Sequence, residues 1–490
     1  MQVAVNRKSL KFLPDSSRVI ARFLSIDEKR GLNLIHSVLN MPDEEAALVL
    51  NRVLRDYSMR HRSISKIFEK HFNKVAHLFA QLNIDPESLQ ITKKILIGSY
   101  FTHEYSIESA AFFNPSIIEH PDQSETGPGE TRVILSFRAT GEGHISSIVF
   151  RTGLIGKHST LVMEPVGKML EEAERIQRHI YNKESFRAKL EEMKDFHPII
   201  PSSLILDKLE DKFTYEELLN CIDEARRALH LASDKEILFN QIIWLASSHY
   251  ELDFSLDTNI SERVIFPVSA NEKNGIEDAR FVKFKESDNK TIYYATYTAY
   301  DGTTILPKLL DTSDFHHFRV IPLHGEIAQN KGMALFPRKL NGRYAMLCRL
   351  DGFNNYLAFS DNISVWREAK LIQQPKFPWE LIQIGNCGSP IETEEGWLVL
   401  THGVGPMREY VMGASLFDLQ NPEKEIGRLK NPLIIPNSEE REGYVPNVVY
   451  SCGSIVHNED LIIPYAMSDY SSTYATVNLR ELLNELKNSR

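Results

Sequence analysis

The chain has 490 residues, of which 42% are hydrophobic and 25% are charged. One ordinary core rarely grows to this size, so two or three folded units are expected. The composition is that of a globular protein, and the formal net charge of −10 argues against a general affinity for nucleic acid or anionic membrane. The sequence has no apolar run of about 18 residues, so no membrane-spanning helix is expected.

The four cysteines stand far apart, at Cys221, Cys348, Cys387 and Cys452. They form no CxxC pair, and the histidines show no HExxH pattern, so neither a metal site nor a cofactor is expected. The N-terminus lacks the apolar core and cleavage site of a signal peptide. Reduced, buried thiols and a cytoplasmic location are therefore the expectation.

Residues 25–85 are predicted to be helical. Ser25 with Glu28 fits a capping box, in which side chains satisfy the free amide groups of a first turn. Pro42 followed by three acidic residues indicates a second helix start. Apolar residues at every third or fourth position over 64–79 indicate a third helix. We expect an N-terminal helical extension over 1–92.

Strand-like sequence follows over residues 95–155. Thr131–Phe137 and Ile145–Phe150 are rich in β-branched and apolar residues, and a glycine-containing turn separates them. These features predict the first part of a β domain over 93–160.

A second helical block is predicted after this β part. Helical patterns cover 169–179 and 185–193, and Thr214 with Glu217 fits another capping box. We therefore expect a helical insertion over 161–255 that interrupts the β domain.

Short strands and turns fill the remainder, residues 256–490. Asn341-Gly342 between apolar segments is typical of a two-residue hairpin turn. A short helix is expected over 478–488. Strands of this length and spacing favour a sandwich, a barrel or a propeller, and periodicity alone does not choose among them.

The segment Glu277-Asp278-Ala279-Arg280 holds two adjacent carboxylates and an arginine directly before an apolar strand. In a sugar-cleaving site, one carboxyl donates a proton while neighbouring charges set its pKa and hold hydroxyl groups. In isolation, the same pattern is more often a solvated surface ion pair that contributes little. Its interpretation depends on the polar clusters elsewhere in the chain.

Further acids and cations stand at predicted strand ends. Acids beside aromatic side chains suit a sugar, whereas clustered cations suit an oxyanion such as phosphate, because arginine and lysine form charge-assisted hydrogen bonds with its oxygens. No serine nucleophile elbow, dinucleotide fingerprint or P-loop accompanies them. The additional candidates are Arg138, Lys331, Arg349, Asp351, His402 and Asp469.

Five short motifs follow one another along the chain: Gly275–Arg280, Ala334–Met346, Gly396–Gly403, Tyr410–Ala414 and Val445–Val449. In this order they resemble glycoside hydrolase family 130, the mannoside phosphorylases and β-mannosidases. The resemblance covers roughly 100–155 and 260–478 and leaves both helical blocks outside it.

The resemblance implies a mainly β fold, a five-bladed β-propeller with the site in a central funnel. It also implies an inverting mechanism with Asp278 as the general acid, whose proton passes through the 3-hydroxyl of mannose. Phosphate would attack C1 from the opposite face and give α-mannose 1-phosphate. The residues that the resemblance assigns to substrate binding are Asn114, Glu277, Arg280, Asp351 and Asp469.

The choice between phosphorolysis and hydrolysis depends on cations. Phosphate is already a nucleophile, so phosphorolysis needs positive charge rather than a general base. The resemblance places Arg138, Lys331, Arg349, His402 and Tyr410 at or near phosphate-binding positions. This set favours an inverting β-mannoside phosphorylase with inorganic phosphate as co-substrate.

Two alternatives stay open at this point. The first is an inverting β-mannosidase of the same family, in which Glu439, Glu440 or Glu442 would activate water. The second is a non-catalytic carbohydrate-binding propeller. The partners expected in the leading interpretation are a β-mannosyl oligosaccharide and phosphate. The helical segments are expected to bury their apolar faces against the β domain or against a second subunit, which would make a homo-oligomer.

Overall fold

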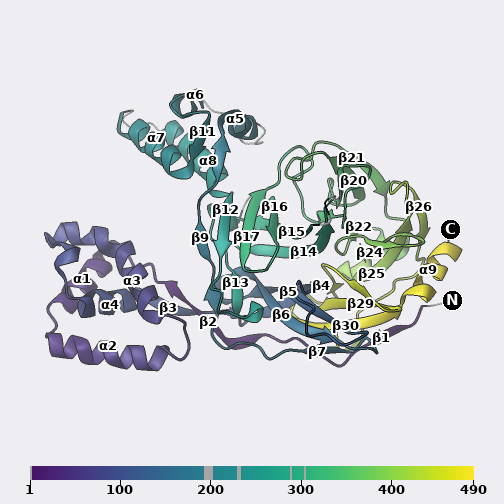
Figure 1. Ribbon diagram of the computed structural model, residues 1–490, viewed down its shortest axis with the longest axis horizontal. Coiled ribbons are helices and arrows are strands. Elements are labelled where there is room, and N and C mark those ends of the chain that lie inside the picture. The colour runs from purple at the N-terminus through teal and green to yellow at the C-terminus, as the bar shows by residue number, and fades with distance from the viewer. Residues whose placement is uncertain are drawn as a thin grey trace.

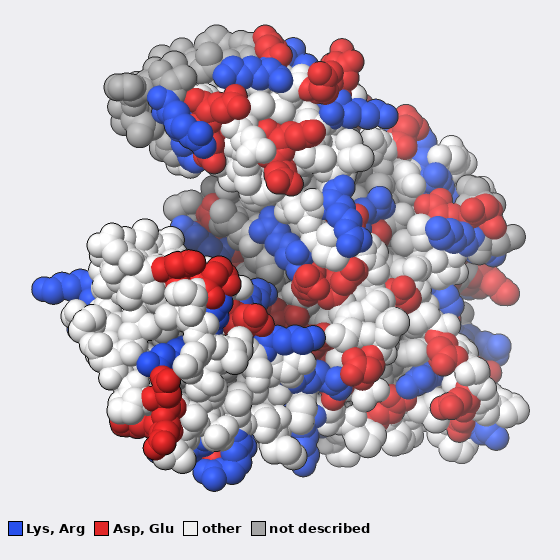
Figure 2. Space-filling view, turned by 60° about the vertical axis from the view of Figure 1, so that its left-hand side comes forward, with Lys and Arg blue, Asp and Glu red and all other residues white. Residues whose placement is uncertain are grey.

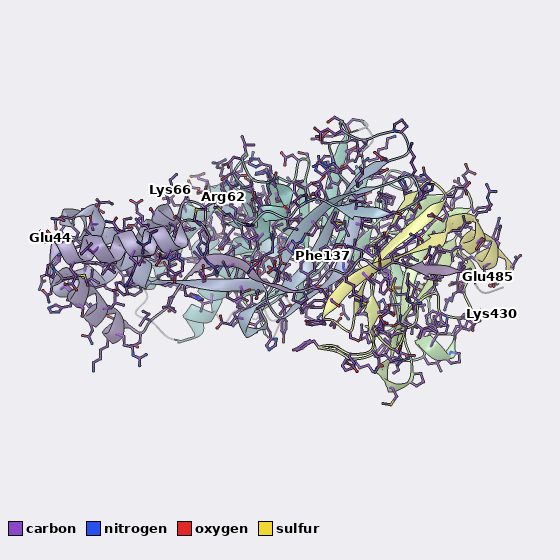
Figure 3. The ribbon with its side chains drawn as sticks, turned by 90° about the horizontal axis from the view of Figure 1, so that it is seen from below. Glu44, Arg62, Lys66, Phe137, Lys430 and Glu485 are labelled. Carbon is purple, nitrogen blue, oxygen red and sulfur yellow. The ribbon has the colours of Figure 1, made fainter. Side chains whose placement is uncertain are left out.

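The structure is a computed structural model that describes residues 3–489 except 192–201, 229–232, 287, 289 and 303–304. Its body is mainly β, and two helical units extend from one side of it (Figure 1). Seen from below, the molecule is elongated, with the unit that carries Glu44 and Lys66 at one end and Lys430 and Glu485 near the other (Figure 3).

Five sheets of four to six strands form the body. The first three sheets follow the chain in order, apart from short strands that the insertion adds to two of them. The first sheet contains β4 (Ala111–Glu119), β5 (Thr131–Thr140), β6 (Ser146–Ile155), β7 (Leu161–Met163), β8 (Glu171–Glu172) and β13 (Arg263–Ile265). The second contains β9 (Glu174–Ile176), β12 (Tyr250–Asp253), β14 (Ile276–Lys285), β15 (Thr291–Tyr300), β16 (Ile305–Thr312) and β17 (His317–Pro322). The third contains β18 (Ala334–Leu335), β19 (Tyr344–Cys348), β20 (Asn355–Ser360) and β21 (Ala369–Gln373).

The last sheet joins the two ends of the chain. Its outer strand β1 (Val5–Arg7) comes from the N-terminus and pairs with β30 (Ser471–Asn478), so both termini lie on the same side of the body (Figure 1). The other strands of this fifth sheet are β27 (Val449–Tyr450), β28 (Ile455–His457) and β29 (Asp460–Met467). The fourth sheet contains β22 (Gln383–Asn386), β23 (Ile391–Thr393), β24 (Gly396–Val404), β25 (Tyr410–Phe417) and β26 (Glu425–Arg428).

Hydrophobic cores lie between successive sheets, and one core also joins the fifth sheet to the first. Successive side chains of a strand point to opposite faces, so one strand serves two cores. In β29, Leu461 and Ile463 pack toward the fourth sheet while Ile462 packs toward the first. Each sheet is therefore held from both sides, which fixes the positions of the strand ends.

The two helical units have cores of their own. The N-terminal unit contains α1 (Glu28–Leu39), α2 (Asp43–Tyr57), α3 (Ile64–Val75) and α4 (Ile91–Tyr100) around one apolar cluster. The insertion contains α5 (Lys183–Glu191), α6 (Ser203–Leu206), α7 (Tyr215–Ala228) and α8 (Ser233–Ser247) around another. In the described residues these helices mainly cover one another, so of the two expected alternatives burial against the β domain is not observed, and burial against a second subunit stays a prediction.

Two-stranded ribbons connect the helical units to the body. They are β2 (Asp15–Phe23) with β3 (Thr102–Glu108), and β10 (Ile180–Asn182) with β11 (Lys212–Thr214). At the first ribbon, Arg18 and Arg151 both pair with Glu108 at 2.6 Å, and Glu108 is fully buried. A buried carboxylate with two guanidinium partners fixes the ribbon against the first sheet, because removing one partner would leave an uncompensated charge.

Several predicted elements differ from the structure. Helix α4 extends to residue 100, whereas strand was predicted from residue 95, and the predicted helix over 169–179 contains strands β8 and β9. These two strands pair with β13 and β12, so pairing at sheet edges outweighs the local helical pattern. At α1 the cap is Asp27, which accepts a hydrogen bond from the Arg30 amide, rather than Ser25.

Other predictions from the sequence are confirmed. The helix after Pro42, the Thr214–Glu217 capping box and the C-terminal helix α9 (Leu479–Asn488) are all present. Asn341 and Gly342 both have positive φ angles and join β18 to β19, as a tight hairpin turn requires.

The surface carries both signs of charge. On the face shown in Figure 2, basic and acidic side chains are interspersed, and neither sign covers the whole face. None of the described helices combines the length and apolarity needed to cross a membrane.

Gly98→Ala should destabilise the N-terminal helical unit. A Cβ at Gly98 would lie 1.8 Å from the carbonyl oxygen of Phe68, so α3 and α4 would have to move apart. We expect a loss of about 1–3 kcal/mol in the local free energy of unfolding, measured by hydrogen–deuterium exchange in both helices. Gly31→Ala is the matched control, since its Cβ would meet only side chains, that of Leu78 at 3.3 Å and that of Phe101 at 3.7 Å. Equal protection in both variants would contradict the prediction.

Candidate active site

In four of the five sheets, an edge strand carries a polar residue of one cluster. Asn114 lies on β4, Asp278 on β14, Asn386 on β22 and Tyr450 on β27. Hydrogen bonds or electrostatic effects link these groups to one another, directly or through Arg280. The five-sheet frame thus converges on one cluster of polar side chains, which we take as the candidate active site.

The central residues occupy unusual backbone conformations. Asn114, Asp278 and Asp469 have φ angles of 49°, 55° and 51°, in the left-handed region that non-glycine residues rarely adopt. Register shifts accompany the first two, between Phe113 and Ser116 and between Glu277 and Arg280. Such bulges redirect side chains and are frequent beside active sites, where the surrounding structure offsets the strain.

The two acids of the Glu277-Asp278 motif share one cation. Arg138 donates to Glu277 through Nη2 at 3.0 Å, and its Nη1 lies 3.5 Å from a carboxylate oxygen of Asp278. Asn114 Nδ2 donates to Asp278 at 2.7 Å, and Lys331 Nζ pairs with Glu277. The motif is therefore a largely buried network and not the solvated ion pair that is common for such sequences.

The two aspartates respond oppositely to their surroundings. Burial opposes the ionisation of Asp278, but Arg138, the hydrogen bond from Asn114, and the charges of Lys331 and Arg280 outweigh burial and hold its pKa below the usual value. Burial, followed by the charge of Asp278, raises the pKa of Asp469 to about 6. Of this pair, Asp469 is therefore the carboxyl that retains a proton nearer to neutral pH.

Arg280 is held by two residues that the sequence analysis did not assign to the site. Its guanidinium donates to the side-chain oxygen of Asn386 and to the hydroxyl of Tyr450. Asn386 also donates to the carbonyl of Gly332 at 2.7 Å, which connects the third and fourth sheets. Gly385 and Gly388 beside Asn386 are the sequence signal that could have found it, whereas Tyr450 directly follows the Val445–Val449 motif but was not assigned a role.

Arg349 and His402 form the next part of the site. Arg349 Nη1 lies 3.4 Å from His402 Nε2, and His402 Nδ1 lies 3.2 Å from the carbonyl oxygen of Asn386. Burial, with the charges of Arg349 and Arg280, holds the pKa of His402 well below its usual value, so the ring is neutral. The carbonyl requires a proton on Nδ1, and Nε2 then accepts from Arg349.

Tyr410 completes this side of the cluster. Its ring stacks on His402 with centroids 6.0 Å apart and planes inclined by 12°. The guanidinium of Arg408 lies 5.8 Å from the centroid of the Tyr410 ring. The five residues that the sequence assigned to phosphate binding thus form two groups. Arg138 and Lys331 contact Glu277, whereas Arg349, His402 and Tyr410 lie next to one another.

Asp351 lies outside this network. Its carboxylate accepts from the amides of Phe353 and Asn354, both at 2.9 Å, and from the Tyr356 hydroxyl at 2.8 Å. These bonds fix an exposed turn after β19, and no contact recorded among the described residues joins Asp351 to Asp278. The structure therefore gives Asp351 a role in the turn and does not bring it to the sugar-binding candidates.

Glu440, one of the residues considered as a base for water, is also occupied. It is 3% exposed, accepts from the Tyr465 hydroxyl at 2.6 Å and pairs with Arg7 at 3.2 Å. These partners tie the segment before β27 to the fifth sheet. Among the described residues, no three His, Cys, Asp or Glu side chains gather in the way a metal ion requires.

Comparison with known proteins points to carbohydrate phosphorylases. A family model described as β-1,4-mannooligosaccharide phosphorylase matches residues 241–488. A 1,2-β-oligomannan phosphorylase of Thermoanaerobacter sp. is 34% identical over 228 residues, which cover 44% of this chain and 74% of that protein. A β-1,2-mannobiose phosphorylase of Listeria innocua is 29% identical over 243 residues, which cover 48% of this chain and 65% of that protein.

A solved structure is also similar to this chain. It is a complex of β-1,2-mannobiose phosphorylase from Listeria innocua with β-1,2-mannobiose. The superposition has a TM-score of 0.46 and 23% sequence identity, and it covers 78% of this chain and 93% of that one.

Asp469→Asn should stabilise the protein, and the gain should grow with pH. The folded-state pKa of about 6 lies above the ordinary value of 3.8, so wild type loses stability as pH rises through this interval. We expect the variant to gain up to about 3 kcal/mol at pH 8 and little at pH 4, measured by urea unfolding. Asp361→Asn, at a carboxylate that is 88% exposed, should show no such trend. A gain that does not change with pH would contradict the assignment.

Proposed function

The chain belongs to glycoside hydrolase family 130, and we propose that it is an inverting β-mannoside phosphorylase. In the proposed reaction, a β-mannosyl oligosaccharide and inorganic phosphate give α-mannose 1-phosphate and a chain shorter by one mannose. Phosphate is the co-substrate, and the reaction needs no cofactor.

One observation carries the choice of phosphate over water, namely the excess of positive charge in the site. Near the carboxylates of Glu277 and Asp278 the site contains four cationic side chains, those of Arg138, Arg280, Lys331 and Arg349. Among the described residues, the two carboxylates pair with Arg138 and Lys331 only.

The remaining two cations contact neutral groups. Arg280 binds Asn386 and Tyr450, and Arg349 lies against the neutral ring of His402. Arg349 Nε is buried and has no hydrogen-bond partner. A buried guanidinium without a counterion is costly, and a bound dianion would supply both charge and acceptors. Two guanidinium groups without a carboxylate partner suit a bound phosphate, whereas hydrolysis would not need them.

The site residues have complementary roles in this reaction. A phosphate oxygen attacks C1 of the mannosyl unit as the bond from C1 to the leaving oxygen breaks on the opposite face. The leaving oxygen receives a proton, which Asp278 supplies through the mannose 3-hydroxyl. Asn114 and Asp469 lie near Asp278 and would hold that sugar. Arg138 contacts both Glu277 and Asp278 and so holds the acid in position.

Protonation of Asp278 is coupled to phosphate in this proposal. The surrounding cations keep Asp278 ionised in the free site, yet a general acid must carry a proton. A phosphate dianion at Arg280 and Arg349 would neutralise part of that positive charge and repel the carboxylate anion. The pKa of Asp278 would then rise as phosphate binds, so the acid becomes competent when the nucleophile is in place.

We also propose that the five sheets are the blades of a β-propeller. The support is that hydrophobic cores link each sheet to the next and the fifth to the first. For the linkage we propose β-1,2, because the two relatives compared above are named for β-1,2-linked mannosides.

The function is tested by incubating the chain with β-1,2- and β-1,4-mannobiose, with and without phosphate. Release of α-mannose 1-phosphate that requires phosphate is the expected result. Asp278→Asn should lower kcat at least about 100-fold, since general acid catalysis is lost. Asp361→Asn is the control, because that carboxylate is exposed. Cleavage at equal rates without phosphate would favour the hydrolase instead.

Arg349→Gln should weaken phosphate binding specifically. Loss of one charged hydrogen-bond donor should raise the KM for phosphate at least tenfold, whereas the KM for the mannoside should change by less than about threefold. Arg343→Gln, at a half-exposed arginine on the β18–β19 hairpin, is the matched control. An unchanged KM for phosphate would remove Arg349 from the proposed phosphate site.

A further inference from the structure

A buried ion pair lies shortly before the Glu277-Asp278 motif in the chain. Glu272 ends the short 3-10 helix η5 (Ala270–Glu272), and its side chain is fully buried. Lys308 of β16 is also fully buried and pairs with Glu272 at 2.7 Å. Taking two charges out of water is costly unless further hydrogen bonds satisfy them. The other partners of this pair therefore indicate what it holds together.

The carboxylate of Glu272 is held from several elements. The Tyr250 hydroxyl lies 2.8 and 2.9 Å from its two oxygens, and the Tyr297 hydroxyl donates to one of them at 2.8 Å. Two backbone amides of the preceding segment donate to it at 3.3 and 3.2 Å. Burial opposes ionisation, but the charge and the hydrogen bond of Lys308 outweigh burial and hold the pKa of Glu272 at about 2. The carboxylate is thus ionised at neutral pH and fixed in one position.

The backbone of Glu272 is attached to the start of β14. Its carbonyl accepts from the amide of Gly275 at 2.7 Å. Gly275 has a φ of 130°, and a Cβ there would lie 2.5 Å from Ser146 Oγ, so the turn approaches the first sheet closely. The same hydroxyl donates to the carbonyl of Ile276 at 2.9 Å. The turn therefore has little room to shift without moving the motif that follows it.

Strand β15 links Glu272 to the register of β14. Tyr297, which donates to Glu272, is followed by Thr298, which lies opposite Glu277 in the ladder. The pairing is interrupted after this position, and Asp278 lies within the interruption with a φ of 55°. No register partner in the described strands fixes the backbone of Asp278. Its position depends on what holds the ends of the bulge, and Glu272 holds the N-terminal end.

The network also reaches the helical insertion. Tyr250 begins β12 shortly after α8, and the Asn271 side chain donates to the hydroxyl of Ser248 at the end of this helix. Arg175 of β9 donates to the carbonyl of Ser247 at 3.0 Å, and its guanidinium lies 5.1 Å from the centroid of the Tyr250 ring. The base of the insertion is therefore connected to the residues that surround the Glu272 carboxylate.

We propose that Glu272 is a positioning residue for Asp278, and that its buried pair with Lys308 keeps the acid within hydrogen-bond distance of Asn114. The inference rests on the proposed function, in which Asp278 supplies the proton. Glu272 acts through the turn before β14 and through β15, and Tyr250 makes the base of the insertion part of this support. Because a displacement of about 1 Å can cost on the order of 100-fold in rate, the pair controls kcat rather than substrate binding.

The test measures kcat and both KM values for phosphorolysis of the mannobiose that wild type cleaves. Glu272→Gln should lower kcat at least about tenfold, whereas the KM values for phosphate and for the mannoside should change by less than about threefold. Tyr250→Phe keeps the ion pair and removes one hydroxyl, so it should fold normally and lower kcat about fivefold with the same unchanged KM values.

Two control variants separate positioning from a general loss of stability. Glu108→Gln changes another fully buried carboxylate with two cationic partners, at the ribbon that joins the N-terminal helical unit to the body. Tyr181→Phe removes a buried hydroxyl that donates to the carbonyl of Ala246 inside the insertion, at 2.7 Å. Both should keep kcat within about twofold of wild type, because neither contacts the turn before β14.

The outcomes distinguish this inference from the proposed function. An unchanged kcat in Tyr250→Phe, or equal losses of kcat in the control variants, would overturn the inference and leave phosphorolysis intact. Absence of phosphate-dependent cleavage by wild type would overturn the function itself. A crystal structure of Glu272→Gln, or of Tyr250→Phe if the first variant does not fold, then reads the position of the acid without turnover. The distance from Asn114 Nδ2 to Asp278, 2.7 Å in wild type, should exceed about 3.2 Å, and an unchanged distance would refute the inference.

Discussion

The contact of Arg138 with both Glu277 and Asp278 is the interaction on which the site depends. Arg138 belongs to the first sheet and the two acids to the second, so one guanidinium fixes the distance between two independently formed strands. It also determines the charge state of the acid. Without this cation, burial would favour the neutral carboxyl and two adjacent acids would repel each other. The rest of the site is arranged around this pair of carboxylates, and Arg138 is the cation that contacts both of them.

The frame that holds these residues is made rigid by ordinary apolar packing. Each sheet is pressed between two neighbours, and the strand from the N-terminus pairs within the fifth sheet. Asn114, Asp278 and Asp469 have left-handed backbone conformations, which cost on the order of 1–3 kcal/mol each. The apolar packing of the frame offsets this cost. The helical units do not share these cores, because their apolar side chains cover one another. Three of the left-handed residues thus lie in the candidate site, and the helical units have cores separate from the frame that holds it.

The sequence predicted correctly those elements whose stability depends on residues adjacent in the chain. The turn at Asn341-Gly342 and the capping box at Thr214 depend on a few adjacent residues, and both are present. Strands at 171–176 were missed because their stability comes from distant partners in two sheets. The same distinction applies to the site. The motif around Asp278 is contiguous and could be found, whereas Tyr450 joins it only through a contact with Arg280 across 170 positions. Asp351 has the right chemistry in sequence, but its own turn uses its carboxylate.

The charges of the site explain why one arrangement can serve both proton transfer and phosphate binding. A general acid needs a neutral carboxyl, while a phosphate site needs cations that favour the ionised form, so the two requirements conflict in the free protein. The structure separates them in space: Arg138 and Lys331 are compensated by the acids, and Arg280 and Arg349 are held by neutral partners. Only the second pair is left for a dianion. A bound dianion would reduce the positive potential at Asp278 and thereby raise the pKa of this carboxyl. Phosphate binding and protonation of Asp278 therefore favour each other.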